Sequence, residues 1–210
     1  MIQPYYEHAG ITIYHGDCRE ILPTLPRAAL VLTDPPYGIG SAWKGGRGSG
    51  WCKARAEAGL RNKWDAAPPS DAEIAAAVAA GAEAVVWGGN YFALPPSRGW
   101  LVWTKPERGF SLSEAELAWT SRDTVIRVFD GPRSDIGRKH PTQKPLHLMS
   151  WCLGLFPDAA TVIDPYAGSG TTLVAAKNLG RRAIGIEIEE RYCEIAANRL
   201  RQETLFGVRP

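Results

Sequence analysis

The sequence has no long hydrophobic run, no secretion signal and few cysteines. Strongly apolar runs such as residues 30–32 and 84–87 are far too short to cross a membrane, and the first residues lack the basic and then apolar order of a secretion signal. The four cysteines lie far apart, with no CxxC pair and no histidine at metal-ligand spacing. The sequence therefore predicts a cytoplasmic chain with no membrane contact, no disulfide framework and no metal site.

Internal repeats and low-complexity segments are also missing, and the net charge is only +2 over 210 residues. That charge is unevenly distributed. Residues 41–64 carry a local net charge of +5 and residues 131–144 one of +3, which leaves −6 on the remainder. Two basic segments on an acidic body suit a polyanion such as DNA, although two solvated loops would give the same pattern.

A buried strand is predicted over residues 28–33, and it ends abruptly in Asp34 and the Pro-Pro-Tyr-Gly sequence that follows. The prolines lack N–H groups, so strand pairing has to stop there. This corner carries a carboxylate, unpaired carbonyls and an aromatic ring at the carboxyl end of a strand, where ligands bind in open α/β sheets. A surface turn is the plainer alternative, since Asp-Pro-Pro is common turn chemistry.

Such a corner suits the exocyclic amino group of a nucleobase. The two protons of that amine can be held by the Asp34 carboxylate and by a backbone carbonyl, which we expect to be that of Pro35. This arrangement favours a pyramidal nitrogen whose lone pair faces an electrophile. The ring of Tyr37 can stack on a base that has been extracted from the duplex.

Strands and helices alternate along the chain, which has 45% hydrophobic residues and so ample material for a core. The patterns predict further strands over 11–14, 84–87, 100–103, 161–164 and 183–187, and weaker strands over 116–119 and 125–129. They predict helices over 19–25, from the Ser70 cap to Gly81, over 146–155, from 171 to the Gly180 stop, and after 187. Residues 38–64 read as a long mobile loop. This order predicts an α/β fold with a mostly parallel sheet and helices on both faces.

A second glycine-rich turn follows the strand that ends at Asp164, and the sequence from Asp164 to Thr172 reads DPYAGSGTT. Its glycines let the backbone approach a ligand at a helix N-terminus. Glu187 ends the next strand 19 residues beyond Gly168, a spacing that suits a carboxylate accepting hydrogen bonds from both hydroxyls of a ribose. The GxGxxG pattern of dinucleotide-binding enzymes is not completed after Gly170, which argues against a dehydrogenase.

With these motifs, the chain resembles the amino-methylating DNA methyltransferases that act on adenine N6 or cytosine N4, over nearly its whole length. The stretch 34–37 (DPPY) matches the catalytic tetrapeptide of that family, the turn 164–170 looks like its S-adenosylmethionine loop, and Glu187 looks like its ribose carboxylate. Residues 140–145 (HPTQKP) are similar to the segment that caps the methionine end of the cofactor, and Asp17 resembles the acid near its adenine. The catalytic motif precedes the cofactor loop, which is the permuted order of the family's beta class.

The resemblance implies a Rossmann-like methyltransferase fold with permuted motif order and S-adenosyl-L-methionine as cofactor. The catalytic residues it implies are Asp34, Pro35, Pro36 and Tyr37. The cofactor-binding residues it implies are Asp17, Cys18, Asp34, Thr142, Lys144, Asp164, Tyr166, Ala167, Gly168, Ser169, Gly170, Thr171, Thr172 and Glu187. The DNA-binding residues that we expect in the basic segments are Trp43, Lys44, Arg47, Lys53, Arg138 and Lys139. Plainer readings remain for His140 as a loop hydrogen-bonder, Lys144 as a solvent-exposed side chain and Thr172 as a helix cap.

We interpret residues 1–210 as a single methyltransferase catalytic domain with DNA-contacting loops at 38–64 and 120–144 and no separate target-recognition domain. The predicted function is site-specific methylation of adenine N6 in DNA, of the restriction-modification type. The target base is expected to be flipped out of the duplex, and the assembly considered is a homodimer. An aspartate at the head of the tetrapeptide is the family's usual adenine form. The alternatives are methylation of cytosine N4, methylation of RNA or of a protein amide, and a non-catalytic DNA-binding relative.

Overall fold

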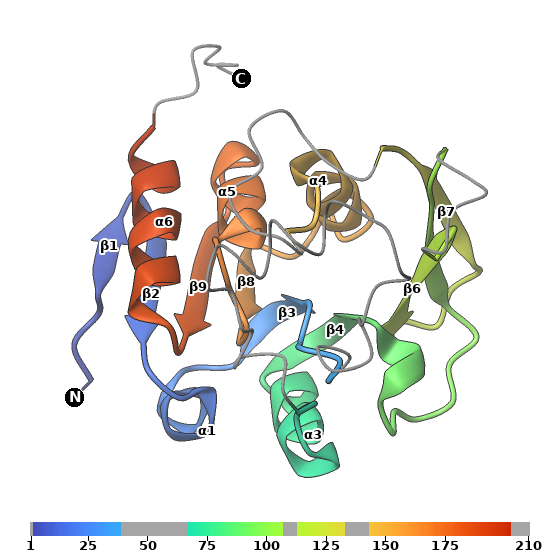
Figure 1. Ribbon diagram of the computed structural model, residues 1–210, viewed down its shortest axis with the longest axis horizontal. Helices are drawn as coiled ribbons and strands as arrows, with labels where there is room; N and C mark the ends of the chain where they lie inside the picture. Colours follow the sequence, from blue (N-terminus) through green and yellow to red (C-terminus); the bar gives the residue numbers. More distant parts are fainter. Residues whose placement is uncertain (1, 39–66, 107–112, 133–142, 203–210) are drawn as a thin grey trace, which may run out of the picture.

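The computed structural model describes residues 2–38, 67–106, 113–132 and 143–202, which form a sheet with helices on both of its faces (Figure 1). The strands are β1 (Tyr6–His8), β2 (Ile11–His15), β3 (Ala28–Thr33), β4 (Gly81–Trp87), β5 (Trp100–Thr104), β6 (Ala115–Thr120), β7 (Arg127–Asp130), β8 (Thr161–Asp164) and β9 (Arg182–Glu187). The helices are α1 (Cys18–Ile21), α3 (Asp71–Ala79), α4 (Leu146–Gly154), α5 (Thr171–Asn178) and α6 (Glu190–Arg201), with 3-10 turns η1 (Leu22–Thr24) and η3 (Gly89–Tyr91).

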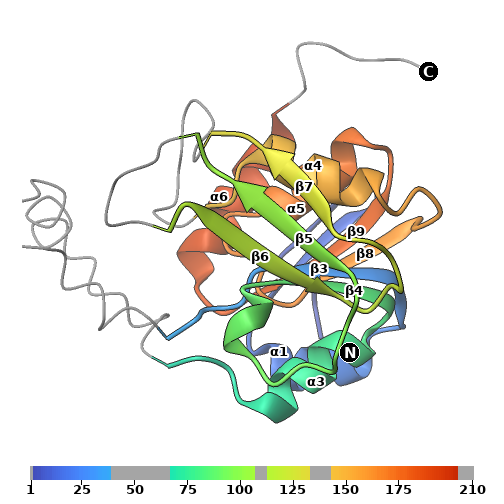
Figure 2. The ribbon, with the colours of Figure 1, turned by 90° about the vertical axis from the view of Figure 1, so that its right-hand side faces the viewer.

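The nine strands pair in the order β1-β2-β9-β8-β3-β4-β6-β5-β7. The strands from β2 to β4 in this order run parallel, whereas β1 and β6 are antiparallel to their neighbours. Figure 2 shows β6, β5 and β7 side by side at the end of the sheet that faces the viewer, opposite β1. The predicted mostly parallel α/β fold is confirmed, and the carboxyl ends of β2, β9, β8 and β3 meet at one edge, where ligands bind in such sheets.

The core lies on both faces of the sheet, because consecutive residues of a strand point in opposite directions. In β4, Val85 and Trp87 belong to the cluster beneath α4 and α5, whereas Ala84 and Val86 belong to the cluster on the other face. All four side chains are fully buried. Burial of one large apolar side chain contributes about 1.5–3 kcal/mol, so the central strands hold the sheet edge in place between two layers of helices.

The helix and strand predictions are confirmed except at a few ends. The Ser70 capping box opens α3 as expected, with Ser70 and Glu73 bonding each other's backbone N–H. Gly81, predicted to close that helix, is instead the first residue of β4, where a Cβ would collide with the backbone of Val31. Strand β1 was not predicted, because its three residues are too short to show a period.

Several predicted features lie outside the described residues. These are most of the loop 38–64, the greater part of the basic segment 131–144, and the residues Trp43, Lys44, Arg47, Lys53, Arg138, Lys139, His140 and Thr142. Within the described ranges, no helix is long and apolar enough to span a bilayer.

Candidate active site

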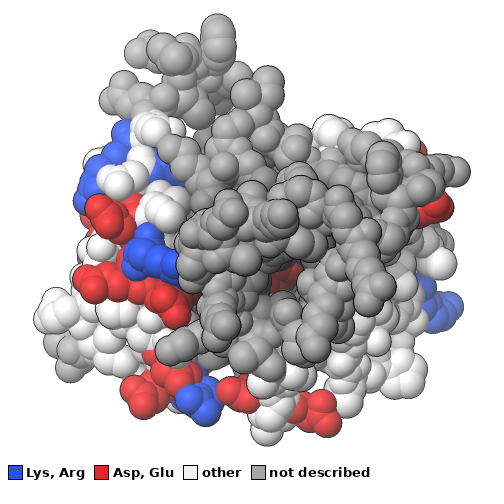
Figure 3. Space-filling view, in the orientation of Figure 1, with Lys and Arg blue, Asp and Glu red and all other residues white. Residues whose placement is uncertain are grey.

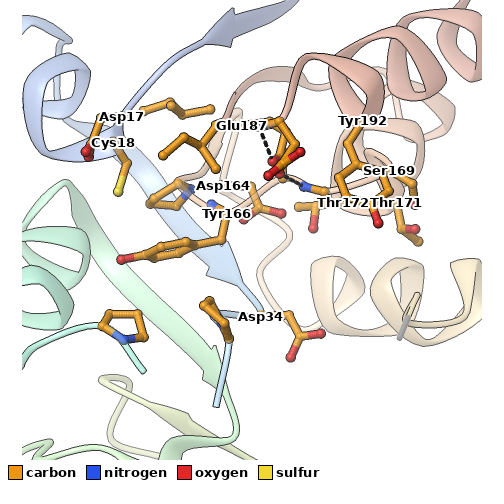
Figure 4. A pocket seen from close by; sticks show the side chains of 18 of the residues that line it. Asp17, Cys18, Asp34, Asp164, Tyr166, Ser169, Thr171, Thr172, Glu187 and Tyr192 are labelled. Carbon is orange, nitrogen blue, oxygen red and sulfur yellow. Dashed lines mark hydrogen bonds between the residues drawn. The ribbon is translucent and has the colours of Figure 1, made fainter. Parts of the chain in front are cut away.

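A cavity of about 450 Å³ opens at the carboxyl ends of β2, β3, β8 and β9. Figure 4 shows Glu187 and Asp34 on opposite sides of this cavity in that view, with Asp164 between them. The predicted site residues that line it are Asp17, Cys18, Asp34, Pro36, Lys144, Asp164, Tyr166, Ala167, Gly168, Ser169, Thr171, Thr172 and Glu187. The fold therefore brings together motifs that lie far apart in the sequence, in a space large enough for a nucleotide-sized ligand.

The corner after β3 holds Asp34 in a network of hydrogen bonds. The ammonium group of Lys144 lies 2.7 Å from both carboxylate oxygens of Asp34, and the hydroxyl of Tyr37 donates a third bond to the same carboxylate. Lys144 Nζ also lies 3.2 Å from the Tyr37 oxygen. The side chains of Lys144 and Asp34 are only 7% and 22% exposed. The readings of Asp34 as part of a plain surface turn and of Lys144 as solvent-exposed are therefore wrong.

A second acidic residue, Glu116 of β6, reaches the same ammonium group and was not predicted. Its Oε2 lies 3.1 Å from Lys144 Nζ, and its Oε1 accepts a hydrogen bond from Lys105. Burial raises the pKa of Asp34 and would lower that of Lys144, but Asp34 and Glu116 together keep the Lys144 pKa well above its usual value. Burial would also raise the pKa of Glu116, yet Lys144 and Lys105 lower it to about 2. Both carboxylates thus share one charged lysine.

Tyr37 is packed rather than open to the cavity. Its ring stacks on that of Tyr91 with centroids 5.0 Å apart and an angle of 20° between the planes, and Phe92 meets its edge. The backbone of Gly88 presses on the same ring. Tyr91 is 55% exposed, so the outer wall of this aromatic group faces solvent.

The close approach of Gly88 to Tyr37 gives a stability prediction. Gly88 has a φ of +68°, and a Cβ there would overlap with the Tyr37 ring, which its hydrogen bond to Asp34 prevents from moving freely. Gly180 has a φ of +66° with nothing within 4 Å of its Cβ position. Gly88→Ala should therefore lower the free energy of unfolding by about 1–3 kcal/mol more than Gly180→Ala, measured by chemical denaturation. If both variants lost the same free energy of unfolding, the Tyr37 ring would be able to move away from a Cβ at position 88 without loss of stability.

The glycine-rich turn after β8 is anchored by Asp164. Its Oδ1 accepts hydrogen bonds from Thr33 Oγ1 at 2.7 Å and from the Tyr166 N–H at 3.1 Å, and burial raises its pKa to about 6. The Thr172 side chain bonds Asp164 as well, whereas Gly170 is the N-cap of α5. The reading of Thr172 as the helix cap is therefore wrong, and Asp164 ties the turn to β3 and α5.

Glu187, at the end of β9, holds the other side of this turn. Its Oε2 accepts from the Gly168 N–H and its Oε1 from the Glu189 N–H, each at 2.8 Å. Burial raises the Glu187 pKa. Gly168 has a φ of +51° and nothing within 4 Å of its Cβ position, so the backbone borders open space that a ligand can approach. Each carboxylate oxygen keeps a lone pair for such a ligand.

Two residues beside the β2 tip complete the wall. Asp17 caps α1 and is bound by Arg19, whose hydrogen bond lowers the Asp17 pKa against the opposing effect of burial. Cys18 is half-buried, and its burial raises the pKa of its thiol. With Tyr166, this end of the cavity has apolar surface flanked by a carboxylate. The residues present thus fit an adenosine-type cofactor, with a carboxylate for the ribose and backbone open to the ligand.

Arg199 of α6 is a supporting residue that the sequence patterns did not single out. Its guanidinium donates to the Ser169 carbonyl at 2.6 Å and to the Thr171 hydroxyl at 3.1 Å. The Ser169 hydroxyl in turn donates to the side-chain carbonyl of Gln143 at 3.1 Å. Surface helices carry many arginines, so an arginine near the end of an amphipathic helix does not stand out in the sequence as a residue that supports a ligand-binding turn. These hydrogen bonds of Arg199 hold the turn between β8 and α5 in place.

Charges are mixed on the described part of the face that Figure 3 shows. In Figure 3, the described Lys and Arg side chains alternate with Asp and Glu around the rim of that face, without one continuous basic patch. The basic segments predicted to contact DNA fall largely outside the described residues, so their role stays a prediction.

A mostly parallel sheet with a cavity at its carboxyl edge, a glycine-rich turn and acidic strand ends defines a nucleotide-cofactor enzyme of the α/β class. The profile of the N6_N4_Mtase family, described as DNA methylase, matches residues 87–198, more than half of the chain. The YubD protein of Escherichia coli (strain K12) is 32% identical over 208 residues, with 88% of each chain covered. The chain therefore belongs to the N6/N4 DNA methylase family.

Further relatives agree with this assignment. The type II methyltransferase M.ScaI of Streptomyces caespitosus is 24% identical over 274 residues, which covers 96% of this chain and 84% of that protein. The PvuII DNA methyltransferase, described as cytosine-N4-specific, superposes with a TM-score of 0.66 at 16% identity, covering 97% of this chain and 91% of the other. The complex of M1.HpyAVI with S-adenosylmethionine gives a TM-score of 0.57 at 23% identity, covering 91% and 100%. The two structures show likeness of fold alone.

Proposed function

We propose that this DNA methylase transfers a methyl group from S-adenosyl-L-methionine to the exocyclic N6 amine of adenine in DNA. The observation that carries the proposal is the cavity itself, which has the Asp34 corner on one side and the anchored turn with Glu187 on the other. Asp34 suits an amine that donates two hydrogen bonds, and Glu187 suits the vicinal hydroxyls of a ribose.

S-adenosyl-L-methionine is the methyl donor, and when bound it supplies an electrophilic methyl group. Glu187 would hold the ribose hydroxyls, Gly168 would let the backbone approach the cofactor, and Asp17 and Cys18 would border the adenine. The Asp164 network keeps the turn in shape before the ligand arrives. Because these groups are already fixed by backbone hydrogen bonds, little ordering remains to be done on binding.

Asp34 acts on the amine that receives the methyl group. Its carboxylate accepts a hydrogen bond from the amine, with the Pro35 carbonyl as second acceptor, and stabilises the positive charge that develops on nitrogen. The amine nitrogen would bond the methyl carbon as the sulfur–methyl bond breaks and leaves a neutral thioether, and the methylated nitrogen would then release one proton to solvent water. Because the Tyr37 ring is already stacked on Tyr91 and packed against Gly88, the target base would meet the exposed ring of Tyr91, with Tyr37 supporting it from behind.

The expected product is N6-methyladenine. An aspartate heads the DPPY tetrapeptide, and the resemblance associates this form with adenine, although cytosine presents the same two amine protons. Purified protein should be incubated with isotopically labelled cofactor and, in separate reactions, with unmodified DNA, RNA or a protein mixture, and the DNA should be digested to nucleosides for mass spectrometry. Label in N6-methyladenine supports the proposal, label mainly in N4-methylcytosine overturns the choice of base, and labelled RNA or protein with unlabelled DNA overturns the substrate.

The DNA itself is proposed to contact the basic segments. Residues 38–64 and 120–144 are the DNA-contacting loops in this proposal, and residues 1–210 form a single catalytic domain. Lysine and arginine side chains there would bind phosphates, and tryptophans would stack on bases or fill the place of a flipped one. Assembly of the protein as a homodimer also stays a prediction.

A further inference from the structure

The Asp34 corner ends in a row of alternating charges in which the lysines are buried and the carboxylates of Asp34 and Glu116 are 22% and 27% exposed. Asp34 bonds Lys144, Lys144 bonds Glu116, and Glu116 bonds Lys105. The two lysines are only 7% and 4% exposed. Four separate segments contribute these groups: the turn after β3, the residue before Pro145, strand β6 and the turn after β5. The charges balance within the row, as buried charges require.

This row raises a problem for catalysis. Lys144 lies 2.7 Å from both oxygens of Asp34, and Tyr37 donates to one of them. A target amine needs an acceptor on the same carboxylate. Oδ1 of Asp34 accepts from both Lys144 and Tyr37 and has no lone pair left, so an amine that binds this oxygen displaces Lys144 from it. A buried ammonium that loses its acceptor without another is costly.

We propose that Glu116 is a positioning residue that receives Lys144 when the target amine reaches Asp34. The inference rests on the proposed function, because it presumes that Asp34 binds the amine. Glu116 Oε2 is already 3.1 Å from Lys144 Nζ, so the ammonium can shift its hydrogen bonds from one carboxylate to the other with little movement. Lys105, on the opposite side of Glu116, limits how strongly Glu116 attracts Lys144 and so lets the lysine return.

The groups around the row leave Glu116 as the acceptor for this exchange. Trp87 lies beneath the ammonium, with its ring centroid 5.8 Å from Lys144 Nζ, and Cys152 of α4 is a buried thiol with a raised pKa. Asp164 interacts with Asp34 across the cavity, but Thr33 and the backbone of Tyr166 already bond it. Among the described residues that contact Lys144, Glu116 is the second carboxylate.

The variant Glu116→Gln tests the exchange. It keeps the shape of the side chain but offers Lys144 a neutral acceptor, so the ammonium stays on Asp34 more strongly. The value of kcat/KM for unmodified plasmid DNA should fall roughly tenfold, equivalent to about 1.4 kcal/mol, while the cofactor Kd measured by calorimetry is unchanged. The control Glu83→Gln removes an acid of β4 that pairs with Arg122 away from the cavity, and it should change neither quantity.

The pH profile of kcat/KM separates this role from a merely structural one. Transfer requires ionised Asp34, so the rate is full at high pH and falls as pH drops through the Asp34 pKa. Glu116 raises that pKa and Lys144 lowers it. The acid limb should therefore move to lower pH in Glu116→Gln and to higher pH in Lys144→Met. Shifts of both variants in the same direction would contradict the network as described.

A neutral double variant guards against misfolding. Glu116→Gln leaves Lys105 buried with a weaker partner, so Glu116→Gln combined with Lys105→Met restores the charge balance and should show a similar loss of kcat/KM. If the unaltered protein methylates DNA and both the single and the double variant match Glu83→Gln, the inference is wrong while the proposed function stands. If the unaltered protein transfers no methyl group to DNA, the proposed function itself fails.

Discussion

Replacement of Asp34 by asparagine is expected to lower the rate of methyl transfer to DNA by about 10²–10³-fold. Asparagine has the same shape, but it carries no negative charge to stabilise charge that develops on the amine nitrogen. Its NH₂ group would also face the amine protons or Lys144 where an acceptor is required. The rate should be measured with labelled cofactor on unmodified DNA.

The cofactor should still bind this variant with unchanged affinity by calorimetry, because the hydrogen bonds of the Asp34 side chain go to Lys144 and Tyr37, whereas Glu187 bonds the turn at Gly168. Lys144 keeps Glu116 as a partner, so the fold should survive, which thermal melting monitors. The matched control is Asp123→Asn, a surface acid paired with Arg98, and it should transfer methyl groups at the normal rate. An Asp34→Asn protein that methylates DNA at that rate would remove Asp34 from the chemistry.

Glu187→Ala should weaken cofactor binding by about 10²-fold or more. Two hydrogen bonds from ribose hydroxyls to a carboxylate contribute about 1.5–3 kcal/mol each, and a loss of only about 2.7 kcal/mol is already a hundredfold change in Kd. The substitution also frees the N–H groups of Gly168 and Glu189, so the turn loses an anchor as well. Calorimetric titration with S-adenosylmethionine measures the change.

The control for this variant is Glu190→Ala, which removes an acid in the first turn of α6 that does not line the cavity, and it should bind the cofactor normally. Cofactor affinity distinguishes the roles of the two carboxylates most sharply, because Asp34→Asn should keep the affinity and Glu187→Ala should lose it. If Asp34→Asn lost the cofactor and Glu187→Ala kept it, the two carboxylates would have exchanged roles and the proposed orientation of the cofactor would be wrong.

The ends of the central strands could be predicted because sequence features mark them directly. An apolar run stops at Asp34 before two prolines, another stops at Asp164 before a proline and glycines, and a third stops at Glu187. Gly180 also ends α5 as expected, in a left-handed conformation with a φ of +66°. In each case the proline, glycine or acidic residue that ends the element locally stands where the fold also ends it, so the sequence alone was sufficient to predict these ends.

The partners of these residues could not be predicted in the same way. Lys144 meets Asp34 across 110 positions of sequence, and Glu116 meets Lys144 only because β6 inserts between β4 and β5. A lysine or glutamate in a loop or an alternating strand usually faces solvent, so a solvent-exposed side chain remained an alternative for Lys144, which is predicted to bind the cofactor, and no pattern singles out Glu116. Tyr37 was expected to be free for a base, but its packing against Gly88 and Tyr91 depends on tertiary structure alone.

The order of the strands has a consequence for how the chain folds during synthesis. Strand β2 has β9 as its parallel neighbour, and β3 is joined to that half of the sheet through β8. A growing chain that has emerged from the ribosome up to α4 therefore has both early strands but lacks the two that connect them. The apolar edges of β2 and β3 stay open until the last quarter of the chain is made. Folding should be slow, dominated by contacts distant in sequence, and dependent on protection of those edges from aggregation.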